Sequence, residues 1–357
     1  MKTWRHSLAA FLLLVSALPV LAAEQVGVRQ IEVQSPARGK ALSVTIWYPA
    51  EAGGAETLMG NSRIFAGTPA FVGASPAAGR HPLILLSHGS GARVETMAWL
   101  AKPLVEAGFI VAGPNHPGTT SGDSTPADTP KLWERTEDLS RVLTALSADP
   151  QWHPFINSDQ VGALGFSLGG AAVLDLVGGR VSLEAYARYC EAFPDMADCV
   201  WFAGRRSFVS GAEVTVEPLD LRTVDRTRYE QSNRDARVRF AVLVDPSMAR
   251  AFDPQSLKAI DIPLLFVNQG EAGKVPVSVA ADDLARLTPY GSLIHIPQAV
   301  HFSFLPECKP DGAKILRSLG DPDALCADGG TRPRSDIHKE LADRVTQSFI
   351  RQFDGQR

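Results

Sequence analysis

Apolar residues follow two different periods along the chain, and the change from one period to the other predicts the order of its elements. In two N-terminal segments, 26–33 and 42–48, apolar and polar residues alternate, which is typical of half-buried strands. Gly39 lies between them and favours a turn, so we expect an antiparallel hairpin at one edge of a sheet. The following segment, 50–78, is rich in Gly, Ala and Pro and is expected to form a surface loop.

Beyond this hairpin, continuous apolar runs alternate with segments of helical spacing. Continuous runs suit strands that are buried on both faces of a parallel sheet, and apolar residues at every third or fourth position indicate helices that cover it. The alternation predicts an α/β fold with a mostly parallel, doubly wound sheet and right-handed crossovers. The expected strands are 82–87, 109–112, 161–164, 238–244, 262–267 and 293–296, and the expected helices are 96–107, 132–146, 171–176, 279–287 and 337–353.

One strand-to-helix junction carries the hexapeptide GFSLGG at 165–170. A Gly-x-Ser-x-Gly pattern between a strand and a helix is typical of a nucleophile elbow, a strained turn that presents the Ser hydroxyl at the end of the strand. Glycines are needed there because a side chain would collide with the neighbouring strand or helix. We therefore expect Ser167 to be a nucleophile and the N–H of Leu168 to receive a developing oxyanion. The alternative is a small-residue turn with an idle Ser.

The turns after the neighbouring strands add further candidates. The strand 82–87 ends in a glycine-rich turn, 88–91, which can direct a backbone N–H into a site above the sheet. We expect the N–H of Ser90 to act together with that of Leu168, the alternative being a plain strand-to-helix turn. Since the carboxyl ends of parallel strands meet at one edge of a sheet, four side chains are candidates for lining a substrate site, namely His88, His116, Phe166 and Phe302.

A Ser hydroxyl needs a general base, and the base needs an acid that orients it. His301 is the only His after the elbow in a loop that follows the last expected strand, so we expect it to take the Ser167 proton at Nε2. Two acids could hold its Nδ1–H. Asp245 follows the strand 238–244, where its other interpretation is a turn cap before a proline, and Glu271 follows the next strand.

The chain begins with a targeting segment. A basic start precedes an apolar run at 8–21, and small residues at 20–23 follow, which predicts a signal peptide cleaved after Ala22 or Ala23. The run is short for a transmembrane helix, and a retained membrane anchor is the alternative. We therefore expect a periplasmic or secreted protein without a stable membrane anchor.

Composition and charge narrow the class further. The chain has 357 residues, of which 45% are hydrophobic and 21% charged, so one large α/β domain or two small ones would fit. The formal net charge is −4 and no basic cluster is prominent, which makes nucleic acid an unsuitable partner.

Segment 181–237 interrupts the alternation of strands and helices with two cysteines, several aromatic residues and many charges. An insertion at this place would lie over the nucleophile as a lid, the alternative being a surface excursion without substrate contact. The four cysteines suggest disulfides in an exported protein, and their spacing fits no common zinc motif. Three pairings are possible, and we favour the local one, Cys190–Cys199 with Cys308–Cys326.

Taken together, these motifs resemble the platelet-activating-factor acetylhydrolase-like branch of the dienelactone-hydrolase-related esterases. The resemblance covers nearly all of the mature chain and rests on the segments 46–49, 87–91, 115–118, 133–135, 165–170, 244–246 and 300–302. It implies a single α/β-hydrolase domain over 24–357, an oxyanion hole from Ser90 and Leu168, and Asp245 as the acid. Dienelactone hydrolases proper use a Cys nucleophile, and Ser167 in that position implies a serine esterase.

These observations predict an exported serine carboxylic-ester hydrolase that forms an acyl-Ser167 intermediate, with short acyl groups favoured. No metal or cofactor is needed, because the Ser, His, acid and oxyanion donors cover attack, proton transfer and charge stabilisation. The expected partner is a small-molecule or lipid ester. An alternative is a lipase, phospholipase or polyester hydrolase whose aromatic lid binds long acyl chains. An alternative of another class is a catalytically idle hydrolase fold used as a binding protein.

Overall fold

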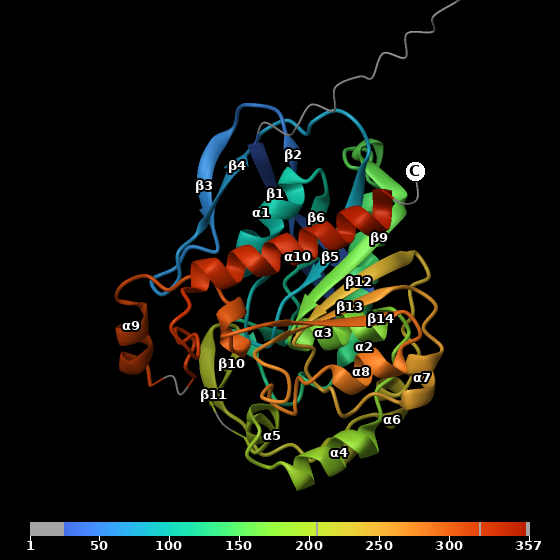
Figure 1. Ribbon diagram of the computed structural model, residues 1–357, viewed down its shortest axis with the longest axis vertical. Coiled ribbons are helices and arrows are strands. Elements are labelled where there is room, and N and C mark those ends of the chain that lie inside the picture. Colours follow the sequence, from blue (N-terminus) through green and yellow to red (C-terminus); the bar gives the residue numbers. More distant parts are fainter. Residues whose placement is uncertain (1–24, 205, 321–322, 355–357) are drawn as a thin grey trace, which may run out of the picture.

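A single ten-stranded sheet with helices on both faces forms the body of the computed structural model (Figure 1). The structure describes residues 25–204, 206–320 and 323–354, so the expected signal peptide at 1–23 lies outside the described residues. The strand order is β14-β13-β12-β9-β5-β6-β2-β1-β4-β3. The strands are β1 Gln25–Ser35, β2 Lys40–Ala50, β3 Ala55–Met59, β4 Thr68–Val72, β5 His81–Ser87, β6 Ile110–Pro114, β9 Ile156–Phe166, β12 Val238–Val244, β13 Leu264–Gln269 and β14 Gly291–Ile296.

Smaller elements and the helices complete the chain. A separate four-stranded sheet has the order β11-β10-β8-β7, with β7 Thr119–Thr120, β8 Asp123–Ser124, β10 Arg206–Val209 and β11 Ala212–Thr215. The helices are α1 Ala98–Glu106, α2 Leu132–Ala148, α3 Leu168–Leu176, α4 Leu183–Ala192, α5 Ala197–Phe202, α6 Arg226–Tyr229, α7 Pro254–Lys258, α8 Asp282–Leu287, α9 Gly312–Ser318 and α10 Arg334–Asp354. Within the described part of the chain, every helix is too short or too polar to span a bilayer.

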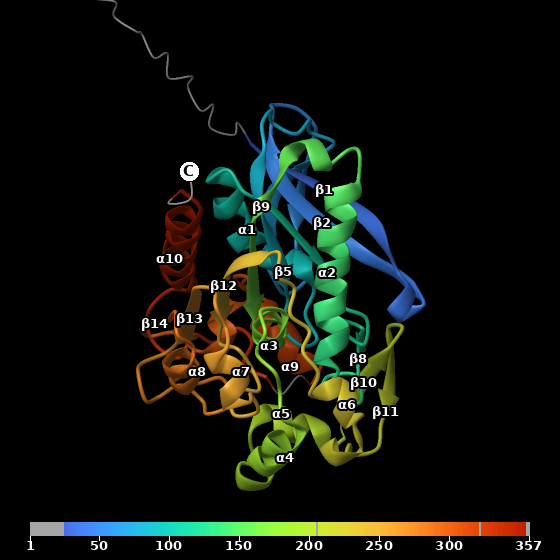
Figure 2. The ribbon, with the colours of Figure 1, turned by 90° about the vertical axis from the view of Figure 1, so that its right-hand side faces the viewer.

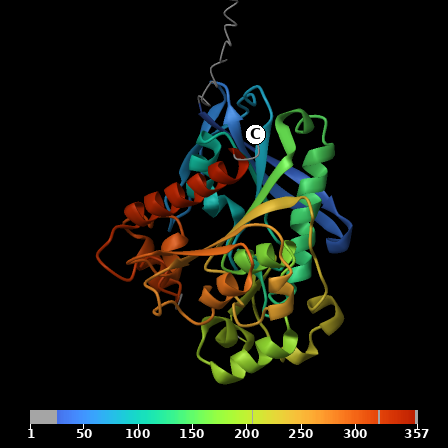
Figure 3. The same cartoon turned by 45° about the vertical axis from the view of Figure 1, so that its right-hand side comes forward.

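The six strands β14, β13, β12, β9, β5 and β6 pair in parallel, which confirms the expected mostly parallel sheet. Its apolar runs are continuous because both faces are covered. On β5, Leu83 and Leu85 enter the core beneath α2 and α3, whereas Ile84 and Leu86 enter the core beneath α1 and α10. Figure 3 shows α10 and α2 on opposite faces of the sheet.

The N-terminal hairpin forms as expected but does not lie at the edge of the sheet. β1 and β2 pair antiparallel through a turn in which Gly39 has φ 62°. β4 then pairs with β1 and β3 with β4, so the segment 50–78, expected to be a loop, supplies the outer two strands. Most side chains of β3 and β4 are exposed or half-buried. Because backbone pairing rather than apolar burial forms these strands, their sequence carries no strand signal.

Between α3 and β12 the chain makes the excursion (residues 181–237), which contains α4, α5, β10, β11 and α6. Figure 2 shows α4 and α5 below α3, at the lower end of the molecule. The excursion contacts the loops that follow β6, because β10 pairs with β8 and Trp201 Nε1 donates a hydrogen bond to Thr129 Oγ1 at 2.9 Å. Cys190 pairs with Cys199 inside the excursion and Cys308 with Cys326 outside it, which is the local pairing favoured above.

The excursion returns to the sheet beside a buried carboxyl group on α3. Asp175 is fully buried, and its Oδ2 accepts a hydrogen bond from Asn233 Nδ2 at 2.8 Å. Burial raises the pKa of Asp175 to about 8, and the hydrogen bond from Asn233 only partly opposes this shift. In the unfolded chain an Asp has a pKa near 4. Because the folded value is the higher one, this group contributes its full stability below about pH 4 and loses it as the pH rises to about 8.

Replacing this carboxyl group by a neutral amide should therefore stabilise the protein only at the higher pH. We expect Asp175→Asn to raise the free energy of unfolding at pH 8 by about 1 to 3 kcal/mol and to lose this advantage near pH 5. Melting temperatures of both proteins between pH 5 and 8.5 test it. Asp235 is the control: burial alone would raise the pKa of this half-buried group, but the hydrogen bonds and charge of Arg237 and the hydrogen bond of Ser140 together lower it. Asp235→Asn should cost most at neutral pH, and a pH-independent effect of Asp175→Asn would contradict the prediction.

Candidate active site

The junction between β9 and α3 has the backbone of a tight, strained elbow. Ser167 has φ 54° and ψ −120°, in the left-handed region that side chains disfavour. A Cβ on Gly165 would lie 2.1 Å from the carbonyl oxygen of Gly169, and a Cβ on Gly169 would lie 1.9 Å from that of Ser87. Only glycine fits either place. The close approach sets the Ser167 side chain at the carboxyl end of β9, above the first turn of α3.

Three polar side chains from separate turns meet at this elbow. His301 begins a short 3-10 helix, His301–Phe304, after β14, and its Nε2 lies 3.1 Å from Ser167 Oγ. Its Nδ1 lies 3.1 Å from Oδ2 of Asp245, which follows β12. The turns after β9, β12 and β14 thus bring Ser167, His301 and Asp245 into one line of hydrogen bonds. His301 remains partly exposed, whereas Asp245 is fully buried.

Asp245 is held by four hydrogen-bond donors. Its Oδ1 accepts from Asn268 Nδ2 and from the backbone N–H of Gln269, each at 2.9 Å. Its Oδ2 accepts from Gln269 Nε2 at 3.0 Å, besides His301. The same amide nitrogen of Gln269 also donates to the carbonyl oxygen of His301 at 3.0 Å. These donors fix the orientation of the buried Asp245 carboxyl group toward His301.

Sequence reasoning did not find Asn268 and Gln269, which end β13. No local signal marks them, because their amides meet Asp245 only once β12 and β13 pair. The other candidate acid, Glu271, lies exposed beyond this strand. Among the described contacts, none joins Glu271 to His301, and the structure brings Asp245 there instead.

Aromatic rings stack against one face of the His301 imidazole. Phe166 stacks on it with ring centroids 4.8 Å apart, and Phe304 stacks on Phe166 at 4.0 Å. Phe166 is buried, so it is a support for the imidazole ring more than a lining residue. Phe302 meets the edge of His301 at 5.5 Å and is half-buried, which leaves it beside the open side of the site.

The turn after β5 lies against the elbow, as an oxyanion donor at Ser90 requires. A Cβ on Gly89 would be 3.4 Å from the Cβ of Ser167. Leu168 is the first residue of α3, where backbone N–H groups lack partners within the helix. The positive end of the helix dipole therefore lies beside Ser167, and the turn 88–91 packs against it.

The expectation that His88 and His116 line the substrate site does not fit the structure. Both side chains are fully buried, and all four ring nitrogens have partners inside the protein. Burial, with the nearby charge of Arg135, lowers the pKa of both rings well below the ordinary value, so both are neutral. The sequence placed them correctly after strands of the parallel sheet, but it did not show that partners inside the protein bind all of their ring nitrogens.

No protein-family model matches the chain, and neither does any curated protein sequence. Solved structures do match. A ferulic acid esterase from Streptomyces cinnamoneus superposes with a TM-score of 0.61 at 19% identity, over 94% of this chain and 92% of that one. The monoclinic form of an esterase from Pyrobaculum calidifontis has a TM-score of 0.44 at 14% identity, over 90% of this chain and 84% of that one.

The chain has the α/β-hydrolase fold. In an α/β-hydrolase, the elbow after the central strand, the acid and the His follow in this chain order. In this chain Ser167, Asp245 and His301 follow β9, β12 and β14 in the same order. Chemically, such an arrangement can withdraw the proton of the hydroxyl, hold the resulting imidazolium and present backbone N–H groups to an oxyanion.

The glycine at the start of α3 gives a direct test of this elbow. Gly169→Ala would force a Cβ into the Ser87 carbonyl group, so β5 and α3 would have to separate. We expect the melting temperature to fall by about 4 °C or more, on the order of 3 kcal/mol, or folded protein to be lost. Gly330→Ala is the matched control, because its Cβ would meet nothing closer than 3.7 Å. Equal melting temperatures for the two variants would contradict the close contact.

Proposed function

We propose that this protein is a serine carboxylic-ester hydrolase that works through an acyl-Ser167 intermediate. The observation that carries the proposal is the His301 ring, which lies 3.1 Å from Ser167 Oγ on one side and 3.1 Å from Asp245 Oδ2 on the other. A Ser hydroxyl becomes a useful nucleophile at neutral pH when such a base accepts its proton in the transition state.

In this mechanism His301 Nε2 accepts the Ser167 proton while the oxygen attacks the ester carbonyl carbon. The oxyanion forms against the N–H groups of Leu168 and Ser90. As the tetrahedral intermediate collapses, the imidazolium gives its proton to the alkoxide leaving group, and an alcohol departs. Water then attacks the acyl-Ser167 carbonyl with His301 again as base, which releases the carboxylic acid and restores the Ser. The π face of Phe166, which stacks on His301, faces the imidazolium formed in each step.

We assign Asp245 as the acid of this triad. Its carboxylate accepts the Nδ1–H of His301, which fixes the tautomer in which Nε2 is free to take the Ser167 proton. Gln269 supports both partners at once, through the Asp245 carboxylate and the His301 carbonyl oxygen. Glu271 is exposed, and this assignment leaves it without a catalytic role.

Short acyl groups suit the packing of the excursion, which we propose forms a lid beside the elbow. Three of its large aromatic side chains are buried within the excursion, where Tyr186 and Tyr189 donate hydrogen bonds to Asp198 and Tyr186 packs edge-on against Phe202. Rings that are used in this way offer little surface to a long acyl chain. The name of the ferulic acid esterase of similar fold refers to an aromatic acid. Small aromatic esters are therefore among the first substrates that we would test.

We also infer export of the mature chain. Two disulfides, Cys190–Cys199 and Cys308–Cys326, are compatible with an oxidising compartment outside the cytosol. They add to the sequence of the first 23 residues, which reads as a signal peptide.

Removing the nucleophile should abolish the reaction. We expect Ser167→Ala to lower kcat for 4-nitrophenyl acetate by about 10³-fold or more, because the attacking oxygen is lost. A fluorophosphonate probe should label the wild-type protein at Ser167 and leave the variant unlabelled. Ser318→Ala, a change at an exposed serine, is the control and should behave as wild type. Near-normal hydrolysis by Ser167→Ala would end the proposal.

The acid can be decided by two charge-neutralising changes compared side by side. We expect Asp245→Asn to lower kcat by about 10³- to 10⁴-fold, because an amide favours the wrong tautomer of His301. Glu271→Gln should stay within about twofold of wild type, as surface substitutions usually do. Circular dichroism and melting curves establish that both variants are folded. A larger loss in Glu271→Gln than in Asp245→Asn would reverse the assignment.

A further inference from the structure

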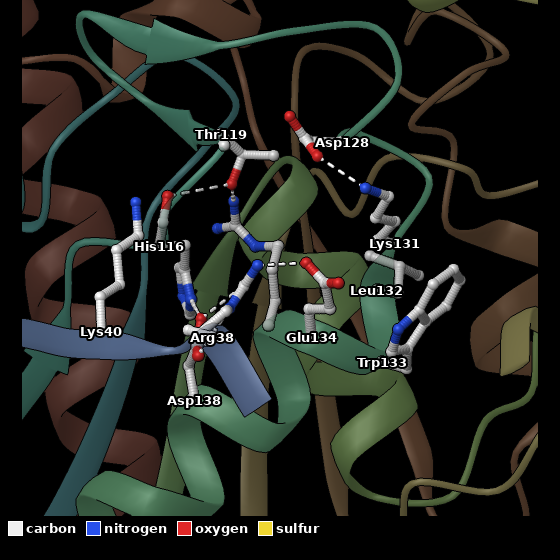
Figure 4. A network of polar contacts seen from close by, with 12 residues as sticks. Arg38, Lys40, His116, Thr119, Asp128, Lys131, Leu132, Trp133, Glu134 and Asp138 are labelled. Atoms are coloured by element: carbon white, nitrogen blue, oxygen red, sulfur yellow. Dashed lines mark hydrogen bonds and ion pairs between the residues drawn. The ribbon is translucent and has the colours of Figure 1, made fainter. Parts of the chain in front are cut away.

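Behind the elbow lies a second chain of Ser, His and Asp side chains. Ser87 Oγ is 3.0 Å from His116 Nε2, and His116 Nδ1 is 2.9 Å from Asp138 Oδ2. Figure 4 shows His116 and Arg38 converging on Asp138. Its side chains are connected in the same order as Ser167, His301 and Asp245. Ser167 and His301 are partly exposed to solvent, whereas this second chain is not. Ser87, His116 and Asp138 are all fully buried.

Hydrogen-bond directions in this cluster follow from its charges. His116 is neutral, so it carries one ring proton, and Asp138 accepts that proton at Nδ1 because the carboxylate is held by Arg38 through two N–H groups at 3.0 and 2.7 Å. His116 Nε2 is then an acceptor, and the hydroxyl of Ser87 donates to it. The remaining lone pairs of Ser87 Oγ accept from Arg135 Nη2 at 3.2 Å. The chain therefore runs in one direction, from Arg135 to Asp138, which lets each bond polarise the next.

Because Arg135 occupies the oxygen of Ser87, this second chain is closed to substrate. Arg135 is itself buried, and burial lowers its pKa to about 9, so it stays charged at neutral pH. A buried charge is retained only when hydrogen bonds compensate it. Besides Ser87, its partners are the hydroxyl of Thr119 at 2.7 Å and the carbonyl oxygen of His88. These two partners connect the cluster to the turn after β5.

The cluster around Arg135 makes hydrogen bonds with backbone groups on both sides of Ser90. Arg135 holds the carbonyl oxygen of His88, one residue before Gly89. The His88 ring accepts the His116 backbone N–H at Nε2, 3.1 Å away, and donates its Nδ1–H to the Gly89 carbonyl oxygen at 2.7 Å. On the other side of Ser90, the N–H of Gly91 donates to the carbonyl oxygen of Thr119 at 2.9 Å. Arg135 thus reaches both flanks of the Ser90 peptide, directly at His88 and through Thr119 at Gly91.

We propose that Arg135 is a positioning residue for the oxyanion hole, which holds the turn 88–91 so that the Ser90 N–H points at the developing oxyanion. The inference rests on the proposed esterase function, because it concerns the second oxyanion donor of that reaction. Arg135 touches neither substrate nor the Ser167–His301 pair, so it acts through the backbone of the turn. A donor displaced by a fraction of an ångström loses transition-state stabilisation while the triad remains assembled.

The test compares an ester with its thiono analogue, because the two substrates depend to different degrees on hydrogen bonds from the oxyanion hole. In a thionoester the developing charge resides on sulfur, a larger atom and a weaker hydrogen-bond acceptor, so hydrolysis gains less from a well-placed N–H. We expect Arg135→Met to lower kcat for phenyl acetate about 10- to 100-fold, with KM within about threefold and with thionoacetate hydrolysis reduced only about threefold or less. The shape of the pH profile of hydrolysis should be the same in the variant and in the wild type.

Arg334→Met is the matched control, since Arg334 is also buried and binds backbone carbonyl groups, those of Leu305 and Pro306, away from the turn 88–91. It should lower the melting temperature without changing the ratio of ester to thionoester rates. If Arg135→Met does not fold, Thr119→Val takes its place, because it removes one Arg135 partner at nearly constant volume. This variant should shift the ratio in the same direction, by about threefold or more.

The outcomes separate this inference from the proposed function. An unchanged ratio in the folded Arg135 or Thr119 variant, or an equal shift in Arg334→Met, overturns the positioning role while the esterase remains. No hydrolysis of either substrate and no fluorophosphonate labelling in the wild type overturn the proposed function together with this inference. Fluorophosphonate labelling of Ser87 in the wild-type protein also overturns it, because the second chain would then be open.

Discussion

The site depends on one backbone contact, the approach of the first turn of α3 to the end of β5. A Cβ on Gly169 would sit 1.9 Å from the Ser87 carbonyl oxygen and 2.7 Å from that of His88. Because no side chain separates the two segments, Ser167 and the turn 88–91 are held in one rigid frame. On one side of this frame Ser167 faces His301, and on the other side Ser87 faces His116. The two Ser–His–Asp chains therefore start from segments whose backbones are in direct contact.

The two Ser–His–Asp chains have the same connectivity but different surroundings. In both, a Ser hydroxyl lies within 3.1 Å of an imidazole, and the other ring nitrogen is hydrogen-bonded to a carboxylate. Ser167 lies at a half-buried elbow with positive φ, next to helix N–H groups without partners in the helix. Ser87 lies within a regular strand, fully buried, with a guanidinium on its oxygen. A cation there stabilises the turn, whereas a cation on Ser167 would block attack. On the proposed function, exposure and the neighbouring charge are what distinguish Ser167 from Ser87.

Local sequence signals predicted the local parts of this structure. The glycines around Ser167 reported a steric requirement that acts within a few residues, and the continuous apolar runs reported burial on both faces, so the elbow and the parallel strands were predictable. The supports of the site come from distant parts of the chain. Gln269 meets Asp245 across 24 residues and Arg135 meets His88 across 47. No local pattern marks such contacts, because they exist only once strand order and helix docking bring those segments together.

The choice between the two acids shows how strand order restricts chemistry. β12 lies directly beside β9 and β13 lies one strand further out. An acid on the turn after β12 reaches His301 with its own short side chain, while the end of β13 contributes amides that complete its hydrogen bonds. A carboxylate at Gln269 in place of the amide would put two negative charges about 3 Å apart, which raises the cost of ionising either. The residue types at positions 245 and 269 therefore depend on each other. A carboxylate at the end of one strand favours a neutral hydrogen-bond donor at the end of the other.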